Sequence, residues 1–271
     1  MGKNSAIGWT HHTWNPYLGC DKIAPECCHC YIDRVLLRMG RRPWGILYKT
    51  KTWDDPARWE KKAAKENLYY RVFTCSLSDF FHVRADEWRP RAWEIIKATP
   101  HMIYLILTKR PELAIKRLPL DWGDGYPNVW LGVSSGCEQT LNKMDSLRKI
   151  PAKLRFLSAE PLLEDISSKI NLDGFGWVIT GGESGHGVEY MWNRSVDWRK
   201  EFNTGGRRTM QLEWPAALYT MCKRRNIPYF FKQITAIKPG QGEDALGAVI
   251  QQFPEAPGTW ATNYLKQQSI A

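Results

Sequence analysis

Six short apolar runs, separated by polar turns and longer helical patterns, constrain the fold of this chain most. Each run is continuous rather than alternating, as expected for strands buried on both faces of a parallel sheet. Strand–helix alternation of this kind is typical of βαβ units. The predicted strands are 71–75, 102–107, 129–133, 154–157, 177–180 and 229–231. The predicted helices are 86–98, 111–118, 139–149 and 214–225.

A seventh strand is expected just before Cys20, which would give a full or partial (β/α) barrel of parallel strands. A doubly wound open sheet is the alternative architecture. Two segments, 36–67 and 187–209, interrupt the alternation, and the residues after Pro239 are rich in Gly, Pro and Gln. A chain of 271 residues suits one large domain. We therefore expect a single domain over 1–271, with elaborations at 36–67 and 187–209 and a peripheral tail from residue 240 onward.

The residues directly after each apolar run are small, polar or charged. In a parallel barrel the carboxyl ends of the strands meet at one face, where active sites form. Charges placed there must be paired or bind a ligand. Lys109, Glu160 and Lys232 are therefore candidate catalytic residues, although a Lys–Glu pair could equally bridge the barrel mouth as a structural contact.

Four of the seven cysteines, Cys20, Cys27, Cys28 and Cys30, fall within eleven residues. The spacing C-x6-C-x2-C lies in a loop with Gly and Pro, ahead of a helix expected to begin near Tyr31. Thiolates are soft ligands that suit zinc or an iron–sulfur cluster. A structural zinc site needs a fourth ligand, here Cys28 or His29, whereas three cysteines suit a [4Fe–4S] cluster with one open iron. The spacing alone does not decide between a zinc site and an iron–sulfur cluster.

The chain carries a net charge of +10, which favours polyanionic partners such as nucleic acid. A basic enzyme without a nucleic-acid role is equally compatible with this charge. The segment 187–209 interleaves aromatic and cationic side chains, a mixture that can stack bases and contact phosphates. An amphipathic lid or an oligomer contact is the alternative for this segment. Its candidate nucleic-acid or substrate residues are Trp192, Arg194, Trp198, Arg199, Arg207 and Arg208.

Seven sequence blocks, in order from Trp9 to Gln233, resemble a family of radical-SAM-like proteins that is common in phages and bacteria. The blocks are TWNPYLGC with the following C-x2-CY, SLSDFF, ILTKRPE, VWLGVSS, RFLSAEPLL, WVITGGESG and IPYFFKQ. Most members of this family have no assigned function. The chain departs from the common pattern in having six residues between the first two cysteines and His29 where an aromatic residue is usual.

The resemblance implies a radical-SAM type of barrel, with Cys20, Cys27 and Cys30 as ligands of a [4Fe–4S] cluster and with S-adenosylmethionine as cofactor. Cys28 would then be an additional thiol. In such barrels the residues at the strand ends contact the cofactor, although Ser and Asp there could instead act as helix caps. The glycines of the turn after the sixth run allow close approach to a ligand. The expected cofactor contacts are Tyr31, Ser76, Ser78, Asp79, Ser134, Gly181, Gly182, Glu183 and Gln233.

The function expected from this resemblance is a radical enzyme that forms a 5′-deoxyadenosyl radical and modifies or rearranges a nucleic-acid base or a nucleotide-derived substrate. A thymine hypermodification in phage DNA is one such reaction, and a flavodoxin or ferredoxin would supply electrons. The alternatives are a zinc-stabilised nucleic-acid-binding protein and a (β/α) enzyme of another class with a structural metal. No long apolar stretch and no apolar leader are present, so a cytoplasmic location, or the host cytoplasm for a phage protein, is expected.

Overall fold

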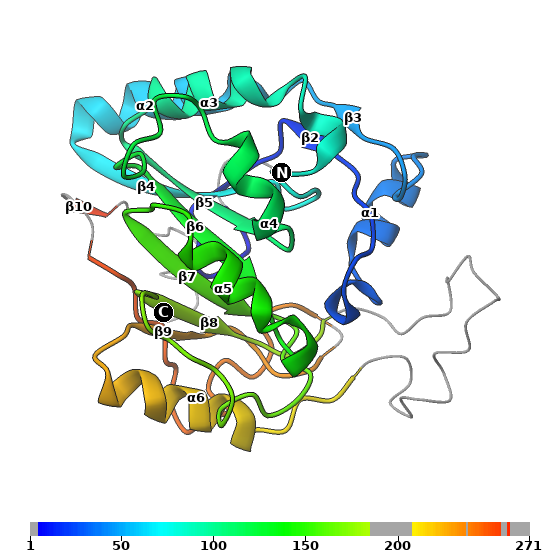
Figure 1. Ribbon diagram of the computed structural model, residues 1–271, viewed down its shortest axis with the longest axis vertical. Coiled ribbons are helices and arrows are strands. Elements are labelled where there is room, and N and C mark those ends of the chain that lie inside the picture. The colour runs from blue at the N-terminus through cyan, green and yellow to red at the C-terminus, as the bar shows by residue number, and fades with distance from the viewer. Residues whose placement is uncertain (1–4, 185–207, 237, 256–258, 261–271) are drawn as a thin grey trace, which may run out of the picture.

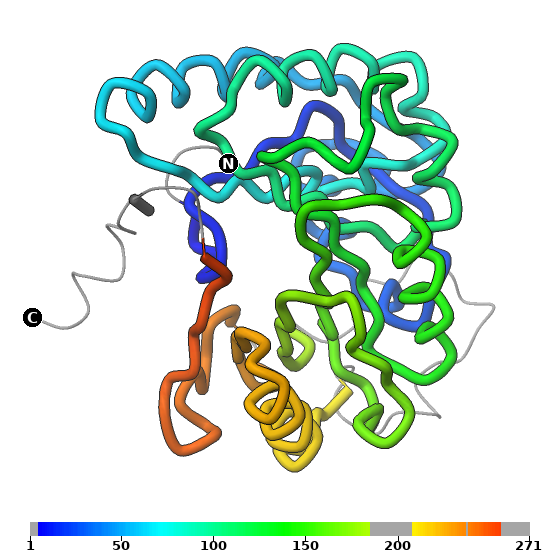
Figure 2. Tube along the Cα trace, turned by 60° about the vertical axis from the view of Figure 1, so that its left-hand side comes forward, coloured from blue at the N-terminus to red at the C-terminus, as the bar shows by residue number. Residues whose placement is uncertain are grey.

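The computed structural model describes residues 5–184, 208–236, 238–255 and 259–260 (Figure 1). Its framework is one parallel sheet whose strands follow one another in the order β1-β4-β5-β6-β7-β8-β9. The sheet is curled into a half-barrel, and the short β10 (Thr259–Trp260) pairs in parallel with β4 (Figure 1, Figure 2). The main strands are β1 (His12–Trp14), β4 (Leu68–Thr74), β5 (Met102–Thr108), β6 (Val129–Ser134), β7 (Leu154–Ala159), β8 (Trp177–Thr180) and β9 (Tyr229–Phe231).

Helices connect the strands and cover the convex face of the half-barrel (Figure 1). They follow one another between successive strands, as expected for βαβ units. The helices of this layer are α2 (Asp55–Glu66), α3 (Arg89–Lys97), α4 (Pro111–Ala114), α5 (Asn142–Arg148) and α6 (Glu213–Arg224). Short 3-10 turns extend the connections at Val83–Ala85, Ile115–Arg117 and Glu138–Thr140. Among the described residues, no helix is both long and apolar enough to span a bilayer.

Both faces of the sheet are buried, which explains why the strands read as continuous apolar runs. In β5, Met102, Tyr104 and Ile106 belong to the core beneath the helices. The intervening Ile103 and Leu105 belong to a separate cluster on the concave face. Aromatic residues dominate this second cluster, namely Trp9, Phe73, Trp130, Phe156, Trp177 and Phe230.

The predicted partial barrel is confirmed at the level of a curled parallel sheet, and each predicted strand lies within or largely overlaps an observed one. The bounds of β8 and β9 agree with the prediction residue by residue. The seventh parallel strand is β1, which lies earlier than expected. The residues just before Cys20 form β2 (Tyr17–Leu18), which pairs antiparallel with β3 (Tyr48–Lys49) instead.

The segment 36–67 is less of an elaboration than its sequence suggested, because it contains the crossover helix α2. This helix was missed because its surface is mostly charged, with Pro56 and Ala63 as its buried residues. The described part of the tail lies mostly at the surface, although part of it reaches the core. Ile250 is buried in the outer core, and its carbonyl accepts a hydrogen bond from Phe231 of β9 at 2.8 Å.

Candidate active site

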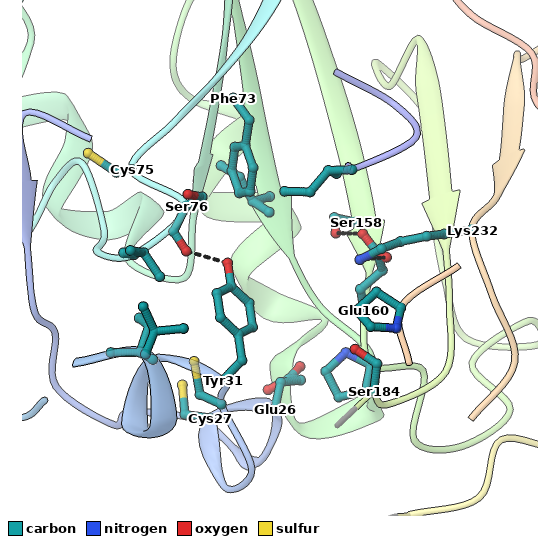
Figure 3. Close-up of a pocket in the computed structure, with 18 of the residues that line it drawn as sticks. Glu26, Cys27, Tyr31, Phe73, Cys75, Ser76, Ser158, Glu160, Ser184 and Lys232 are labelled. Atoms are coloured by element: carbon teal, nitrogen blue, oxygen red, sulfur yellow. Dashed lines mark hydrogen bonds and ion pairs between the residues drawn. The ribbon is translucent and has the colours of Figure 1, made fainter. Parts of the chain in front are cut away.

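A cavity of about 660 Å³ lies at the carboxyl ends of the strands, the face that the sequence predicted (Figure 3). Trp9 and Phe73 of the concave aromatic cluster line it, so its inner part is apolar. Its polar lining comes from the residues directly after several strands. These are Ser76, Ser78 and Asp79 after β4, Lys109 and Arg110 after β5, Glu160 after β7, Glu183 after β8, and Lys232 and Gln233 after β9.

The cysteine loop forms another wall of the cavity. It runs from β2 through the 3-10 turn η1 (Pro25–Cys27) to α1 (Ile32–Arg38), close to the helix start that was predicted near Tyr31. Cys20, Cys27 and Cys30 all line the cavity, and Cys28 is not among its lining residues. All four thiols are free. The loop begins at Gly19, which has a φ of +99° and where a Cβ would lie 2.1 Å from the Ile46 carbonyl oxygen, so glycine is required there.

Burial keeps the thiols of Cys20 and Cys30 protonated in the absence of a ligand. It raises the pKa of Cys20 to about 11 and that of Cys30 to about 12, against opposing contributions from neighbouring donors and cations. A metal or cluster that binds them would therefore displace protons. Among the described residues, no three His, Cys, Asp or Glu side chains gather closely enough to hold a single metal ion.

Asp79 and Arg110 hold the first cysteine in place. The Asp79 carboxylate accepts hydrogen bonds from the Thr108 hydroxyl at 2.8 Å and from the Lys109 backbone amide at 2.9 Å. It also accepts one from Arg110 Nη1 at 3.2 Å, in a buried ion pair. Arg110 reaches on to Cys20 Sγ at 3.6 Å and to the Asp21 carbonyl at 2.9 Å. Both oxygens of Asp79 thus accept hydrogen bonds from protein donors, and these bonds orient Lys109 and Arg110 after β5.

Glu183 holds the middle of the cysteine loop. Its carboxylate accepts a hydrogen bond from His29 Nδ1 at 2.7 Å and pairs with the Arg208 guanidinium at 2.5 Å. The Arg208 backbone amide donates to Glu183 at 2.9 Å, while Arg208 Nη1 donates to the Pro25 carbonyl at 2.8 Å. All three side chains are largely withdrawn from solvent. The predicted ligand contact at the end of β8 therefore serves as a buried clamp on the loop.

Glu26 is a second carboxylate that fixes the loop. It is 4% exposed, and its Oε1 accepts hydrogen bonds from the Gly136 amide at 2.9 Å and the Thr140 hydroxyl at 2.6 Å. Its Oε2 is buried without a hydrogen-bond partner among the described residues. Glu26 also lines the cavity, next to Cys27 (Figure 3).

Tyr31 and the serines after β4 join the loop to the sheet. The Tyr31 hydroxyl donates to the Ser76 carbonyl (Figure 3). The Ser78 hydroxyl donates to the Gly19 carbonyl at 2.6 Å. Asn15 Nδ2 donates to the Ser76 hydroxyl at 3.0 Å. These contacts bring the end of β4 against the loop, so Ser76 and Ser78 lie at the cavity as predicted while their hydroxyls bond to the protein.

An ion pair lies across the cavity from the cysteine loop. Lys232 Nζ is 2.8 Å from Glu160 Oε1, and the Ser158 hydroxyl donates to Glu160 Oε2 at 3.0 Å (Figure 3). The Lys–Glu bridge that the sequence left open is therefore formed. Lys109 differs, because it forms no ion pair with a carboxylate within the described part of the chain. Burial opposes its charge, but Cys27, Glu26 and Cys30 outweigh that effect and raise the pKa of Lys109.

Four other predicted cofactor contacts have evident packing roles. The Ser134 hydroxyl donates to the Glu160 carbonyl at 3.4 Å, and Ser134 is not a lining residue of the cavity. A Cβ on Gly182 would lie 2.2 Å from the Thr235 amide nitrogen, and one on Gly181 would lie 3.0 Å from Glu160 Oε1. The Gln233 side chain bonds the Gly182 carbonyl and the Gly240 amide, each at 2.9 Å.

The candidate residues Trp192, Arg194, Trp198, Arg199 and Arg207 lie outside the described residues. Arg208 is described, and it is buried against Glu183 instead of standing free for a nucleic acid.

Sequence reasoning missed Glu26, and it considered His29 as a possible zinc ligand but not as the partner of Glu183. Both stand inside the cysteine motif, between its ligand candidates, so their position was a usable signal. Their partners, Thr140 and Glu183, are far away in the chain, and no local pattern could reveal them.

Together, the fold and the cavity define a parallel half-barrel α/β protein with a ligand-sized cavity at the carboxyl ends of its strands and three thiols on one wall. The chain belongs to the family described as "Protein of unknown function (DUF5131)", whose model matches residues 4–256. No curated protein and no solved structure matches it. The family model matches nearly the whole chain, and its description assigns no activity. The radical-SAM resemblance therefore stays a prediction.

Proposed function

We propose that this protein is a radical S-adenosylmethionine enzyme that carries a [4Fe–4S] cluster on Cys20, Cys27 and Cys30. One observation carries the proposal: of the four cysteines in the loop, these three, and not Cys28, line the cavity at the carboxyl ends of a parallel half-barrel. This is the face on which barrel enzymes build their active sites. The cavity volume of about 660 Å³ is in the range of sites for small organic ligands.

The donor set fits such a cluster. Thiolates are its usual ligands, and each of the three would bind a different iron, so they need not converge on one point as they would around a zinc ion. Arg110 donates to Cys20 Sγ at 3.6 Å, and Lys109 interacts electrostatically with Cys27 and Cys30. These two cations offset the negative charge of the thiolates. When bound, the cluster would supply the electron that breaks a carbon–sulfur bond of S-adenosylmethionine and yields the 5′-deoxyadenosyl radical.

The remaining residues position the loop and shape the cavity. Glu183 and Glu26 fix the cysteine loop through His29, Arg208 and Thr140. Trp9 and Phe73 make the inner part of the cavity apolar, and an apolar wall would protect a reactive intermediate from side reactions with water. Lys109 and the Glu160–Lys232 pair provide the charged contacts for a polar substrate.

The substrate we propose is a nucleic-acid base or a nucleotide-derived molecule, and the electron donor is a small redox protein such as a flavodoxin or ferredoxin. The net charge of +10 supports a polyanionic partner. A modified thymine of phage DNA is a specific form of this proposal.

Anaerobic purification and reconstitution with iron and sulfide test the cofactor. We expect a brown protein with four irons per chain, as the formula of the cluster requires, that releases 5′-deoxyadenosine from S-adenosylmethionine when reduced. Cys20→Ala, Cys27→Ala and Cys30→Ala should each lose the cluster, whereas the matched control Cys28→Ala should keep it. A colourless protein with stoichiometric zinc, or loss of metal in Cys28→Ala, would instead support the zinc-stabilised alternative.

A further inference from the structure

A second, smaller hollow of about 410 Å³ shares Lys109 and Arg110 with the cavity of the candidate active site. Its remaining lining includes Ile23 of the cysteine loop and Leu113 of α4. Asn142, Lys143 and Ser146 of α5 complete the side formed by that helix. The hollow therefore lies where the loop, α4 and α5 meet, beside the cavity, and the side chains of Lys109 and Arg110 border both spaces.

The charges of this hollow are unbalanced. Lys109, Arg110 and Lys143 contribute three cations, and Glu112, which is exposed, is the acid among the residues that line it. Arg110 is paired with Asp79. Neither Lys109 nor Lys143 forms an ion pair with a carboxylate within the described part of the chain.

Lys143 is the most informative of these residues. Its ammonium is buried and has no hydrogen-bond partner among the described residues. A lysine on a surface helix can normally turn its charge into water, because its side chain has four flexible methylenes. A buried ammonium without a hydrogen-bond acceptor is energetically unfavourable. An anion that entered the hollow would accept hydrogen bonds from the ammonium and lower this energetic cost.

We propose that this hollow binds a phosphate group through Lys143, assisted by Lys109. The proposal rests on the proposed function and deepens it: the ligand is a nucleotide whose base occupies the main cavity and whose phosphate occupies the hollow. Lys109 and Arg110 border both spaces, so the phosphate would lie next to the rest of the same nucleotide. The hollow favours an anion, because the buried group without a hydrogen-bond partner among the described residues is the Lys143 ammonium.

Isothermal titration of the full-length protein tests the site, because phosphate binding does not require the cluster. The probes are inorganic phosphate, thymidine and thymidine 5′-monophosphate. We expect the nucleotide to bind about tenfold more tightly than thymidine, the usual effect of one charge-assisted contact. Lys143→Met keeps the aliphatic stem and should abolish this preference. Lys143→Arg should retain it, and the control Lys149→Met, at an exposed position just beyond α5, should leave it unchanged.

Equal binding of all three probes by the wild type and Lys143→Met would overturn the site. Inorganic phosphate binding as tightly as the nucleotide would keep the anion site but overturn the nucleotide as its source. Circular dichroism confirms that each variant is folded. Cleavage of S-adenosylmethionine with no phosphate binding would refute this inference alone, whereas phosphate binding by a protein that never forms a cluster would refute the proposed function alone.

Discussion

Glu183 links three parts of the chain that lie far apart in the sequence. His29 is 154 residues away and Arg208 is 25 residues away, yet both bind the same carboxylate. The Arg208 guanidinium also reaches the Pro25 carbonyl, so the clamp spans the cysteine loop and the end of β8. A residue with this many buried polar partners is expected to contribute strongly to the stability of the loop.

Replacing Glu183 tests this role. Glu183→Ala would leave a buried arginine without its partner, which is expected to lower the free energy of unfolding by about 3–5 kcal/mol. Urea denaturation followed by circular dichroism measures the change. The control Glu138→Ala removes an exposed pair with Lys169 and should cost less than about 1 kcal/mol. Equal, small effects of the two substitutions would show that Glu183 is not a clamp and is free for a ligand.

The clamp also predicts how stability depends on pH. Burial alone would raise the pKa of Glu183, but His29 and Arg208 outweigh it, so the pKa lies below its ordinary value. A carboxylate with a lowered pKa stabilises the fold above its unfolded-state pKa and loses that contribution as the pH falls through its folded-state pKa. Glu183→Gln cannot titrate. The difference in unfolding free energy between the wild type and Glu183→Gln should therefore be largest near neutral pH and shrink in acid, and a constant difference would contradict this.

The sequence predicted where the polar residues of the site would gather, but not what they do there. Asp79, Glu183 and Gln233 follow buried strands, and all three lie at the cavity. Their oxygen atoms, however, are bonded to protein donors that come from other elements. A strand end can be read from the local pattern, whereas the partners of a side chain depend on contacts between distant segments.

The pairing of β6 with β7 depends on one glycine. Gly132 lies opposite Phe156 in the register of these strands, and a Cβ at this position would lie 2.2 Å from a Phe156 ring atom. The glycine thus provides the space that the phenylalanine ring occupies in the concave aromatic cluster. The run VWLGVS alone could not show that a glycine is needed at position 132, because the need comes from Phe156 on the next strand.

Gly132→Ala is expected to destabilise the protein by about 1–3 kcal/mol, the usual cost of overpacking a core. The double variant Gly132→Ala, Phe156→Leu should recover part of this loss, because the smaller side chain vacates the space. Gly176→Ala is the matched control, since its Cβ would meet Leu154 at an ordinary 3.4 Å. Thermal unfolding of the wild type, both single variants and the double variant gives the coupling energy, and strictly additive effects would argue against the contact.

Most strands could be predicted because burial on both faces leaves a strong local signal, whereas the short helices could not be bounded. The predicted helix 139–149 is a 3-10 turn followed by α5, and the predicted helix 111–118 is α4 followed by a second 3-10 turn. Polar contacts explain one of these breaks. The Thr140 hydroxyl bonds to Glu26 of the cysteine loop, which ties the first turn to the site before the regular helix begins.

The half-barrel as a whole is open between β1 and β9, the two ends of its strand order. Segments from both ends of the chain pack against the concave cluster beside this opening. Trp9 contacts Phe73 and Trp177, with ring centroids 4.5 and 6.4 Å apart. Phe253 contacts Trp177 and Phe230, and the Arg71 guanidinium lies 3.9 Å from its ring centroid. The apolar interior of the cavity therefore depends on residues that lie outside the main sheet.

This arrangement makes the predicted single domain testable. Phe253 is half-buried, so Phe253→Ala should lower the free energy of unfolding by about 2 kcal/mol, less than the loss at a fully buried phenylalanine. If the chain folds as one cooperative unit, tryptophan fluorescence and far-ultraviolet circular dichroism should report the same unfolding midpoint, and the substitution should shift both equally. Leu120→Ala, at a fully exposed position, is the control and should shift neither. A shift confined to fluorescence would mean that the concave cluster unfolds separately from the helix-covered face, and the single-domain prediction would be wrong.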